Sequence, residues 1–267
     1  MSQEKHNRKV TSWQVARHAG VSQSAVSRVF TPGASASHKT QEKVRKAAEE
    51  LGYRPNILAR AMVSGKSRII GLVVGYLDNQ FYPTALEILS TQLKKRGYHL
   101  LIFLAESQRD TLDNVVQDIL DYQVDGIITA SVSLSSDLSD KCRNAGVPMV
   151  QFNRMQDGVT MSSVTSDNYQ GGRQIADLFV ENGYKKISYI TGWEEASTQR
   201  DRERGFVAAL REKGTDLHSR AIGNFTMDDA RKACLELFEK DPPDALFIAN
   251  DHMAFAVMDT LRYELGY

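Results

Sequence analysis

The sequence lacks long apolar runs, has only two cysteines and carries no net charge. Its polar N-terminus, MSQEKHNRK, is followed by no apolar core of a secretory signal. No run approaches the ~20 apolar residues of a membrane-spanning helix. Cys142 and Cys234 fall in separate helical patterns without metal-site spacing, which indicates reduced core thiols. We therefore expect a cytoplasmic protein without membrane contact.

Catalytic and cofactor motifs are also missing. The sequence contains no HExxH, GxSxG or CxxC, and its histidines are scattered singly. The Gly171-Gly172 pair opens no dinucleotide fingerprint, and we expect it to make a close helix–sheet contact instead. The segment Gly65–Ser67 resembles the end of a phosphate loop, but Arg60 stands where that motif requires its first glycine. We therefore expect no catalytic residue, no metal and no cofactor.

Charge is distributed unevenly along the chain. Residues 1–66 contain 12 Lys/Arg and 4 Asp/Glu, a net charge of +8, whereas the remainder holds 21 and 29, a net charge of −8. A basic head on an acidic body attracts phosphate locally and limits non-specific adhesion elsewhere. The N-terminal quarter is thus the candidate nucleic-acid-binding part.

Residues 10–30 show the pattern of two short helices joined by a tight turn. Thr11 can cap the first helix, with Gln14 completing a capping box, and Gly20 permits the turn. Ser22 can cap the second helix, whose outward face carries Gln23, Ser24, Ser27 and Arg28. Such small polar groups can hydrogen-bond base edges in a major groove. The alternative is a plain helical hairpin with a solvated polar face.

A third helix is predicted from Ser37 to Leu51, with Gly52 as its C-terminal cap. Asn56 can then cap a short helix at about 57–63. That helix is too short to be stable alone in water.

Strands and helices alternate from residue 68 onward. Predicted strands cover 68–74, 99–104, 125–130 and 147–152, and predicted helices cover 83–97, 111–123 and 138–145. After a short strand at 163–165 the rhythm starts again, with strands at 186–192, 220–225 and 244–249 and helices at 168–182, 198–213, 227–239 and 251–265. This alternation predicts two lobes, each a parallel sheet with helices on both faces. A ligand cleft is expected where the carboxyl ends of the two sheets face each other.

The segments VARHAGVSQSAVSRVF and TQEKVRKAAEELGYRPNILARAM resemble the headpiece of the LacI/GalR family of bacterial transcription regulators. The resemblance implies an α + α/β fold: a three-helix helix-turn-helix headpiece (1–55), a hinge helix and linker (56–67), and a two-lobed, periplasmic-binding-protein-like α/β body (68–166 and 167–267). Family members continue with further strands after the helix at 251–265. We therefore expect the second lobe to be incomplete and poorly stable.

The resemblance also assigns DNA contacts. Gln23, Ser24 and Arg28 are expected to contact base edges. Four other residues with hydroxyl side chains are expected mainly to position the headpiece on phosphates: Thr11, Ser12, Ser22 and Ser27. Asn56 belongs to the hinge, and Met62 stands where the family usually has an apolar wedge between base pairs. The alternative is that Met62 packs on the headpiece or the body.

Matched positions in the body suggest an effector site, consisting of Phe81, Tyr82, Asn153, Thr198, Arg202, Phe225, Asn250 and Asp251. We expect Phe81 and Tyr82 at the mouth of the cleft, and Asn153 replaces an Asp that the family often has. Guanidinium donors, amides and stacked rings suit a sugar or other polyol, although a nucleobase or an organic acid stays open. For Arg204 we favour a solvated helix face.

These patterns predict a repressor that binds pseudo-palindromic operator DNA as a homodimer and responds to a small effector in the cleft. A solute-binding protein could use the same body, but the basic headpiece argues against it. An α/β enzyme is the second alternative. The third is a DNA-binding protein without an effector response.

Overall fold

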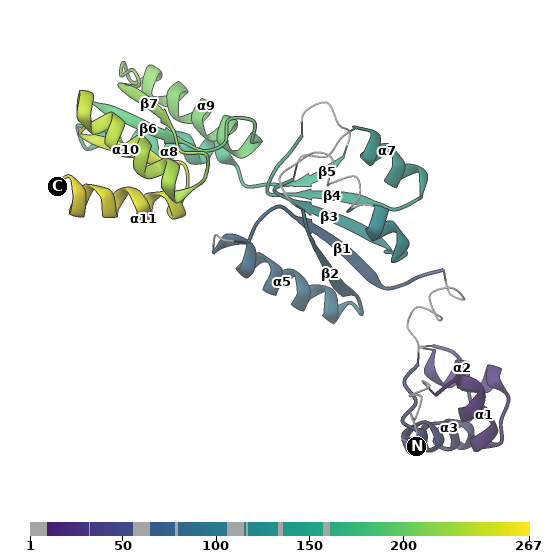
Figure 1. Ribbon diagram of the computed structural model, residues 1–267. Helices are drawn as coiled ribbons and strands as arrows, with labels where there is room; N and C mark the ends of the chain where they lie inside the picture. Colours follow the sequence, from purple (N-terminus) through teal and green to yellow (C-terminus); the bar gives the residue numbers. More distant parts are fainter. Residues whose placement is uncertain are drawn as a thin grey trace. The chain divides into compact units, whose positions relative to one another are not determined.

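The computed structural model describes residues 10–31, 33–55, 65–77, 80–105, 115, 117–132, 136–156 and 161–267 (Figure 1). The chain divides into two units, Met1–Arg68 and Ile69–Tyr267. The predicted hinge helix lies outside the described residues. So do residues 111–114 and 116 of the helix expected at 111–123. Within the described part, no helix is long and apolar enough to cross a membrane.

The described residues of the first unit form three helices, α1 (Ser12–Ala19), α2 (Gln23–Phe30) and α3 (His38–Leu51). The predicted capping box is confirmed, because Thr11 N donates to Gln14 Oε1 at 2.9 Å and Thr11 Oγ1 accepts from Gln14 N at 3.4 Å. Gly20 adopts a φ of 66° after α1, as the predicted turn requires. A small core of Val15, Ala16, Val26, Val44, Ala47 and Ala48 holds the three helices together.

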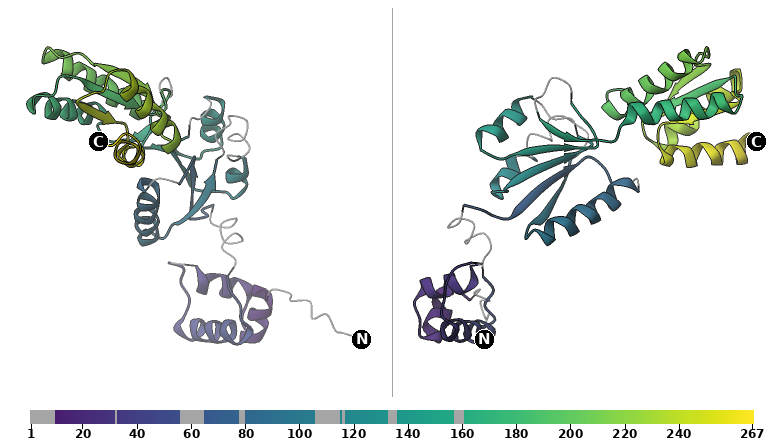
Figure 2. Two further views of the ribbon diagram at one scale, coloured as in Figure 1. Left: turned by 60° about the vertical axis from the view of Figure 1, so that its left-hand side comes forward. Right: turned by 180° about the vertical axis from the view of Figure 1, so that it is seen from behind.

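The first lobe of the second unit is a five-stranded parallel sheet in the order β2-β1-β3-β4-β5. Its strands are β1 (Ile69–Val74), β2 (His99–Leu104), β3 (Gly126–Ala130), β4 (Met149–Phe152) and β5 (Ser162–Val164). The helices α5 (Phe81–Lys95) and α7 (Ser136–Asn144) cover opposite faces of it (Figure 2). The strand order reverses between β1 and β3, which is the position where open α/β sheets bind ligands.

The second lobe repeats this plan with a smaller sheet in the order β7-β6-β8. Its elements are α8 (Asn168–Glu181), β6 (Ile187–Thr191), α9 (Ser197–Glu212), β7 (Ser219–Ile222), α10 (Met227–Lys240), β8 (Ala245–Ile248) and α11 (Asp251–Asp259). Helices α8 and α9 pack together, and so do α10 and α11 (Figure 1). The predicted α/β character of both lobes is confirmed, and the second sheet is the smaller of the two.

Two predicted boundaries are wrong, each for a local reason. The strand expected at 220–225 ends at Ile222, because Asn224 and Phe225 adopt φ values of 51° and 61°, which no strand accommodates. The helix expected at 251–265 is regular only to Asp259 and continues as a π-helix, η1 (Thr260–Glu264). There the Thr260 hydroxyl donates to the Ala256 carbonyl at 3.0 Å, competing with the regular backbone pattern.

The contact made by Gly172 also differs from the expected helix–sheet contact. A Cβ on Gly172 would lie 2.0 Å from the carbonyl oxygen of Arg202 in α9, and a Cβ on Gly205 would lie 1.9 Å from that of Tyr169 in α8. The two glycines therefore let two helix backbones approach each other closely. The neighbouring Gly171 has no such contact. The close approach is between helices, on one side of the second sheet.

Both cysteines are free and buried, as predicted. Burial raises the pKa of the Cys234 thiol to about 11 and also raises the pKa of Cys142. Neither thiol is therefore activated as a nucleophile at neutral pH.

The glycine contact yields a matched pair of variants. We expect Gly172→Ala to lower the free energy of unfolding by about 1–3 kcal/mol, because the added methyl group forces α8 and α9 apart. Gly171→Ala should be neutral or stabilising by about 0.5–1 kcal/mol, because alanine has the higher helix propensity. Urea unfolding followed by circular dichroism measures both. Equal stabilities of the two variants would contradict the close-contact account.

Candidate DNA-binding face and effector cleft

The predicted DNA-binding side chains form one exposed face around the start of α2. Ser22, Gln23, Ser24, Ser27 and Arg28 are all exposed. Gln23 Nε2 donates to Ser12 Oγ at 3.0 Å, so α1 and α2 hold this amide in place. The hydroxyls of Ser22 and Ser24 are also hydrogen-bonded, at 3.0 Å. The face is thus partly pre-ordered, which lowers the entropy lost on binding.

A groove of about 530 Å³ lies beside Arg28 and was missed by the sequence analysis. It is lined by Ala25, Arg28, Ala34, Ser35, Ala36, Ser37, Thr40 and Gln41. The small side chains of residues 34–37 make the hollow, but a run of Ala and Ser gives no distinctive sequence signal. Asn56 and Met62, the remaining predicted DNA contacts, lie outside the described residues.

In the body, side chains converge from the carboxyl ends of both sheets. Tyr76 and Ser131 follow β1 and β3, on either side of the reversal in the first sheet. Trp193 and Asn250 follow β6 and β8, on either side of the reversal in the second. The strand order therefore places four polar or aromatic residues where such sheets bind ligands.

Arg154 connects these two groups of residues. Its guanidinium carbon lies 5.9 Å from the ring centroid of Tyr76 in the first lobe. The same carbon lies 5.3 Å from the ring of Trp193 and 5.6 Å from that of Phe225 in the second lobe. Next to it, Met155 N donates to Ser197 Oγ at 2.8 Å. In the sequence, Arg154 follows Asn153 at a strand end where the family often has Asp-Arg, but the predicted site included only Asn153 of this pair.

The structure places Tyr82 differently from the expected mouth of the cleft. Its side chain is only 2% exposed, and its hydroxyl accepts a hydrogen bond from Asn153 Nδ2 at 2.9 Å. Burial raises the pKa of Tyr82 above its ordinary value. Phe81 is exposed and stacks on Phe152 with the ring planes 11° apart. Tyr82 therefore supports Asn153 from inside the lobe, because the first turn of α5 directs it into the core.

The matched residues of the second lobe are mostly engaged in internal contacts. Arg202 donates to Asn168 Oδ1 at 2.7 Å and to the Ala249 carbonyl, and burial lowers its pKa from the ordinary value. Asn250 Oδ1 caps α11 by accepting from Met253 N at 2.9 Å. Thr198 is buried, whereas Asp251 is exposed. Arg202 and Asn250 thus shape the strand ends on which the cleft residues stand.

The solvated helix face expected for Arg204 is confirmed. Its side chain is 64% exposed and pairs with Asp201 at 3.3 Å, one turn away on α9. Arg200 pairs with the same carboxylate at 3.2 Å.

Backbone strain occurs at the strand ends near Arg154. Six described residues other than glycine adopt left-handed φ values, and four of them follow strands of the two sheets: Ser131 (60°), Asn153 (69°), Asn224 (51°) and Phe225 (61°). Each follows a strand, and such conformations cost on the order of 1–3 kcal/mol and persist only where the surroundings enforce them. The conformation of Phe225 is enforced by the packing of its ring against Gly192, where an added Cβ would lie 2.1 Å from the Phe225 Cζ atom. Strain at these positions is typical of binding sites.

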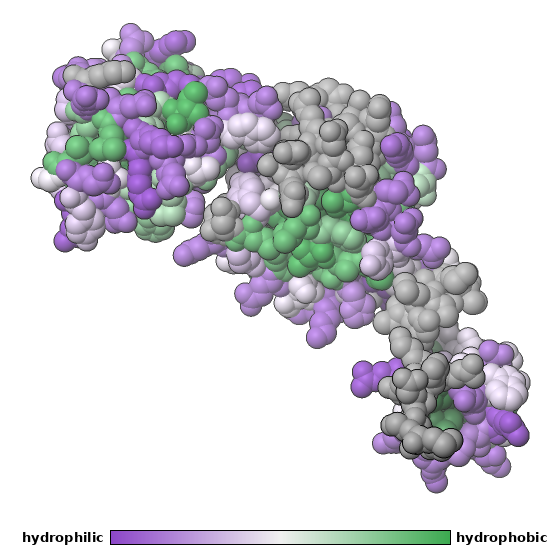
Figure 3. Space-filling view, in the orientation of Figure 1, coloured by the Kyte–Doolittle hydropathy of each residue, from purple (hydrophilic) through white to green (hydrophobic). Residues whose placement is uncertain are grey.

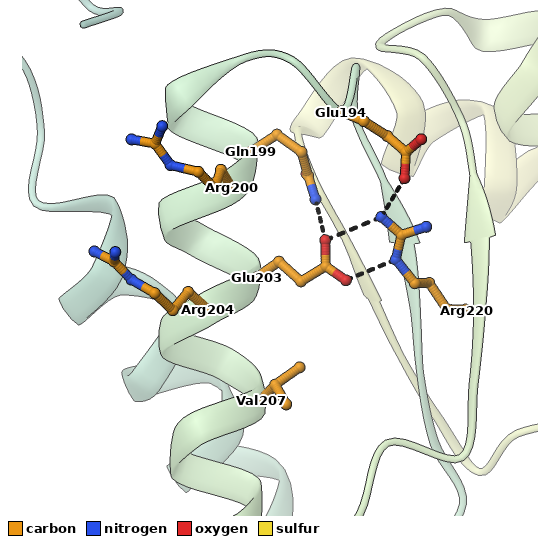
Figure 4. A pocket seen from close by; sticks show the side chains of 7 residues that line it. All are labelled: Glu194, Gln199, Arg200, Glu203, Arg204, Val207 and Arg220. Carbon is orange, nitrogen blue, oxygen red and sulfur yellow. Dashed lines mark hydrogen bonds and ion pairs between the residues drawn. The ribbon is translucent and has the colours of Figure 1, made fainter. Parts of the chain in front are cut away.

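A polar network around Gln199 and Arg220 fixes the loop that carries Trp193, and Figure 4 shows its contacts with Glu194 and Glu203. Buried Gln199 accepts hydrogen bonds through Oε1 from Tyr189 and from Gly192 N, both at 2.8 Å. It donates to Glu203 at 2.9 Å. Arg220 then bonds Glu203 at 2.6 Å and Glu194 at 2.8 Å, so it holds both α9 and the loop. These contacts raise the pKa of Arg220. Sequence spacing could not have shown this network, since its members come from three elements.

We expect Arg220→Met to lower the free energy of unfolding by about 1 kcal/mol, because it leaves two carboxylates without their cation. Arg231→Met is the matched control, since Arg231 forms one ion pair with Asp228 within α10 at 3.1 Å. Thermal unfolding should show a lower Tm for Arg220→Met and an unchanged Tm for Arg231→Met. Two identical melting curves would show that the network does not stabilise the loop.

Together, the fold and these sites define the class of the protein: a helix-turn-helix module joined to a two-lobed α/β ligand-binding body. Residues 67–264 match the family model "Periplasmic binding proteins and sugar binding domain of LacI family". Residues 13–56 match "Bacterial regulatory proteins, lacI family". The chain therefore belongs to the LacI family of bacterial regulatory proteins, as the sequence resemblance indicated, and members of this family are DNA-binding regulators.

Individual relatives agree with this assignment. Catabolite control protein A of Priestia megaterium is 30% identical over 256 residues, which cover 93% of this chain and 76% of that protein. The transcriptional regulator CelR in its cellobiose complex matches with a TM-score of 0.67 and 29% identity, over 96% of this chain and 79% of CelR. The Lac repressor dimer bound to operator and the anti-inducer ONPF shares the fold, with a TM-score of 0.86 and 24% identity over 96% and 78% of the two chains.

Proposed function

We propose that the protein is a sequence-specific DNA-binding transcription regulator, a repressor controlled by a small molecule bound between its two lobes. The observation that carries the proposal is the pre-ordered polar face of α2 on a basic headpiece, in the same chain as a cleft rich in guanidinium and aromatic groups. The domain division is the one expected from the sequence: headpiece to residue 55, hinge to 67, and lobes meeting at 166–167.

In this proposal, two groups of headpiece residues and the hinge contact different parts of the DNA. Arg28, Gln23 and Ser24 contact base edges, whereas Thr11, Ser12, Ser22 and Ser27 bind the phosphates. The hinge, with Asn56 and Met62, enters the minor groove, where Met62 acts as the wedge. Effector binding closes the cleft, changes the spacing of two hinges in a dimer, and so alters operator affinity.

Arg28→Ala tests the DNA-contacting face. We expect a loss of about 1–3 kcal/mol of binding free energy and relaxed sequence preference, because a guanidinium contact to a base edge disappears. The DNA should be a site that the wild-type protein selects from a random-sequence pool, and gel-shift titration measures the affinity. The control Lys46→Ala removes an exposed charge of the same sign from α3. Unchanged affinity and unchanged preference in Arg28→Ala would exclude its role.

The proposed effector is a sugar or related polyol, as in the CelR–cellobiose complex. The predicted effector residues are Phe81, Tyr82, Asn153, Thr198, Arg202, Phe225, Asn250 and Asp251. In the structure, Phe81 and Phe225 offer ring surfaces, while Tyr82, Arg202 and Asn250 support neighbouring groups. We add Arg154, whose guanidinium lies over the rings of Trp193 and Phe225, and Trp193 itself.

We further propose a homodimer formed through the edge strand β2, in line with the dimeric Lac repressor. The edge of a sheet offers unpaired backbone groups to a second chain. On β2, Ile102 and Leu104 are 45% and 63% exposed, and Ile88 of α5 is 58% exposed. Figure 3 shows a contiguous apolar area on the first lobe. An exposed apolar patch of this kind is typical of a protein interface.

Leu104→Lys should convert the dimer into a monomer, because a charge at the centre of an apolar interface costs more than the contact yields. The control is Leu178→Lys, which places the same charge at another exposed leucine, on α8. Sedimentation velocity measures the oligomeric state. A Leu104→Lys protein that remains dimeric would move the interface away from β2.

The proposal places the protein in the cytoplasm, where operator DNA is accessible, and gives it no catalytic step. A solute-binding protein with the same body would show no salt-dependent DNA binding, and an α/β enzyme would turn over its ligand. DNA binding that falls steeply with salt, together with an unaltered ligand after incubation, would exclude both.

A further inference from the structure

Arg154 is a buried guanidinium without a matching carboxylate among the described residues. The residue is 9% exposed, and among the described residues its guanidinium donates to two neutral acceptors. Nη2 donates to the Tyr76 hydroxyl at 3.1 Å, and Nη1 reaches the Ser131 carbonyl at only 3.4 Å. A buried charge normally has a partner of opposite sign, because desolvation is otherwise uncompensated.

Two buried side-chain polar atoms have no hydrogen-bond partner in the described part of the chain. They are Nε of Arg154 and Oγ of Ser131. Both residues follow strands of the first sheet, and Ser131 is held in the left-handed region with a φ of 60°. An unmade hydrogen bond in a well-packed protein has to be explained. The two residues contact each other, because Arg154 Nη1 donates to the Ser131 carbonyl, and both stand at the carboxyl edge of the first sheet.

The side chains around Arg154 stabilise a cation but do not neutralise it. The rings of Tyr76, Trp193 and Phe225 present their faces at 5.3–5.9 Å, and aromatic faces attract a guanidinium. The preceding residue is Asn153, whose amide donates to Tyr82 and carries no charge. Among the described residues, the surroundings of Arg154 therefore leave its positive charge unneutralised.

We infer that the effector carries an anionic group, a carboxylate or a phosphate, which pairs with Arg154 Nε and accepts a hydrogen bond from the Ser131 hydroxyl. This inference rests on the proposed effector cleft and narrows its ligand from a neutral polyol to an acidic or phosphorylated one. A guanidinium suits such a group because its donors match two oxygens at once. The flanking rings cover the apolar face of the attached sugar.

Fluorescence quenching of Trp193 tests the inference without knowledge of the ligand. The chain has two tryptophans, and Trp13→Phe leaves Trp193 as the single reporter, 5.3 Å from the Arg154 guanidinium carbon. Iodide serves as the anionic probe, caesium as the cationic probe and acrylamide as the neutral one. We expect iodide to quench Trp193 more strongly than caesium. In Trp13→Phe/Arg154→Met the iodide quenching constant should fall about twofold, because one nearby screened charge is lost, with acrylamide quenching unchanged.

Two further variants make the result specific. Trp13→Phe/Arg204→Met removes an exposed arginine of α9 and should leave iodide quenching unchanged. Trp13→Phe/Asn153→Asp keeps Arg154 and adds a carboxylate beside it, so iodide quenching should fall and the Tm should rise. This variant decides the question if Arg154→Met fails to fold.

Competition distinguishes the two kinds of anion. At constant ionic strength, replacing chloride by inorganic phosphate or by acetate should protect Trp193 from iodide, and the stronger competitor identifies a phosphate or a carboxylate site. Equal quenching by iodide and caesium, or no response to either Arg154→Met or Asn153→Asp, would overturn the inference. Operator binding is measured separately, so a failed DNA-binding proposal and a failed anion site give different results.

Discussion

The position of Arg154 between aromatic rings of both lobes is the interaction on which the body of this protein depends. Its guanidinium lies over Tyr76 on one side and over Trp193 and Phe225 on the other. Because neither lobe supplies a carboxylate to it among the described residues, the contact is weaker than an ion pair and can be exchanged for a ligand. A contact that is favourable but replaceable is what a ligand-driven change between two conformations requires.

The contacts of Arg154 itself are weak, but the residues around it are held firmly by other interactions. Gln199, Glu203 and Arg220 fix the loop of Trp193 from outside the cleft, and left-handed residues turn the strand ends toward the site. The close approach of α8 and α9 at Gly172 and Gly205 holds the helix from which this network extends. The stabilising contacts thus lie away from Arg154, while the strand ends around it retain strained residues and two donors without a partner among the described residues. This division is typical of binding sites.

Local patterns predicted most of the fold. Caps such as Thr11, Ser22 and Gly52 act within four residues of themselves, so helix boundaries in the headpiece follow from sequence alone. The period of apolar residues likewise predicts the strands. Long-range effects were missed: the helix–helix role of Gly172, the burial of Tyr82 and the three-ring environment of Arg154 depend on residues far away in the chain. Family resemblance indicated candidate site positions. It did not show which of these residues face the ligand and which hold neighbouring residues in place.

Discrimination between DNA sequences at fixed salt shows whether the headpiece recognises a specific operator. The measurement compares the affinity of the full chain for its selected pseudo-palindromic site with that for a scrambled duplex of equal length and composition. We expect a preference for the selected site on the order of 10³ or more, with both affinities falling as the salt concentration rises. Equal affinity for the two duplexes would contradict it.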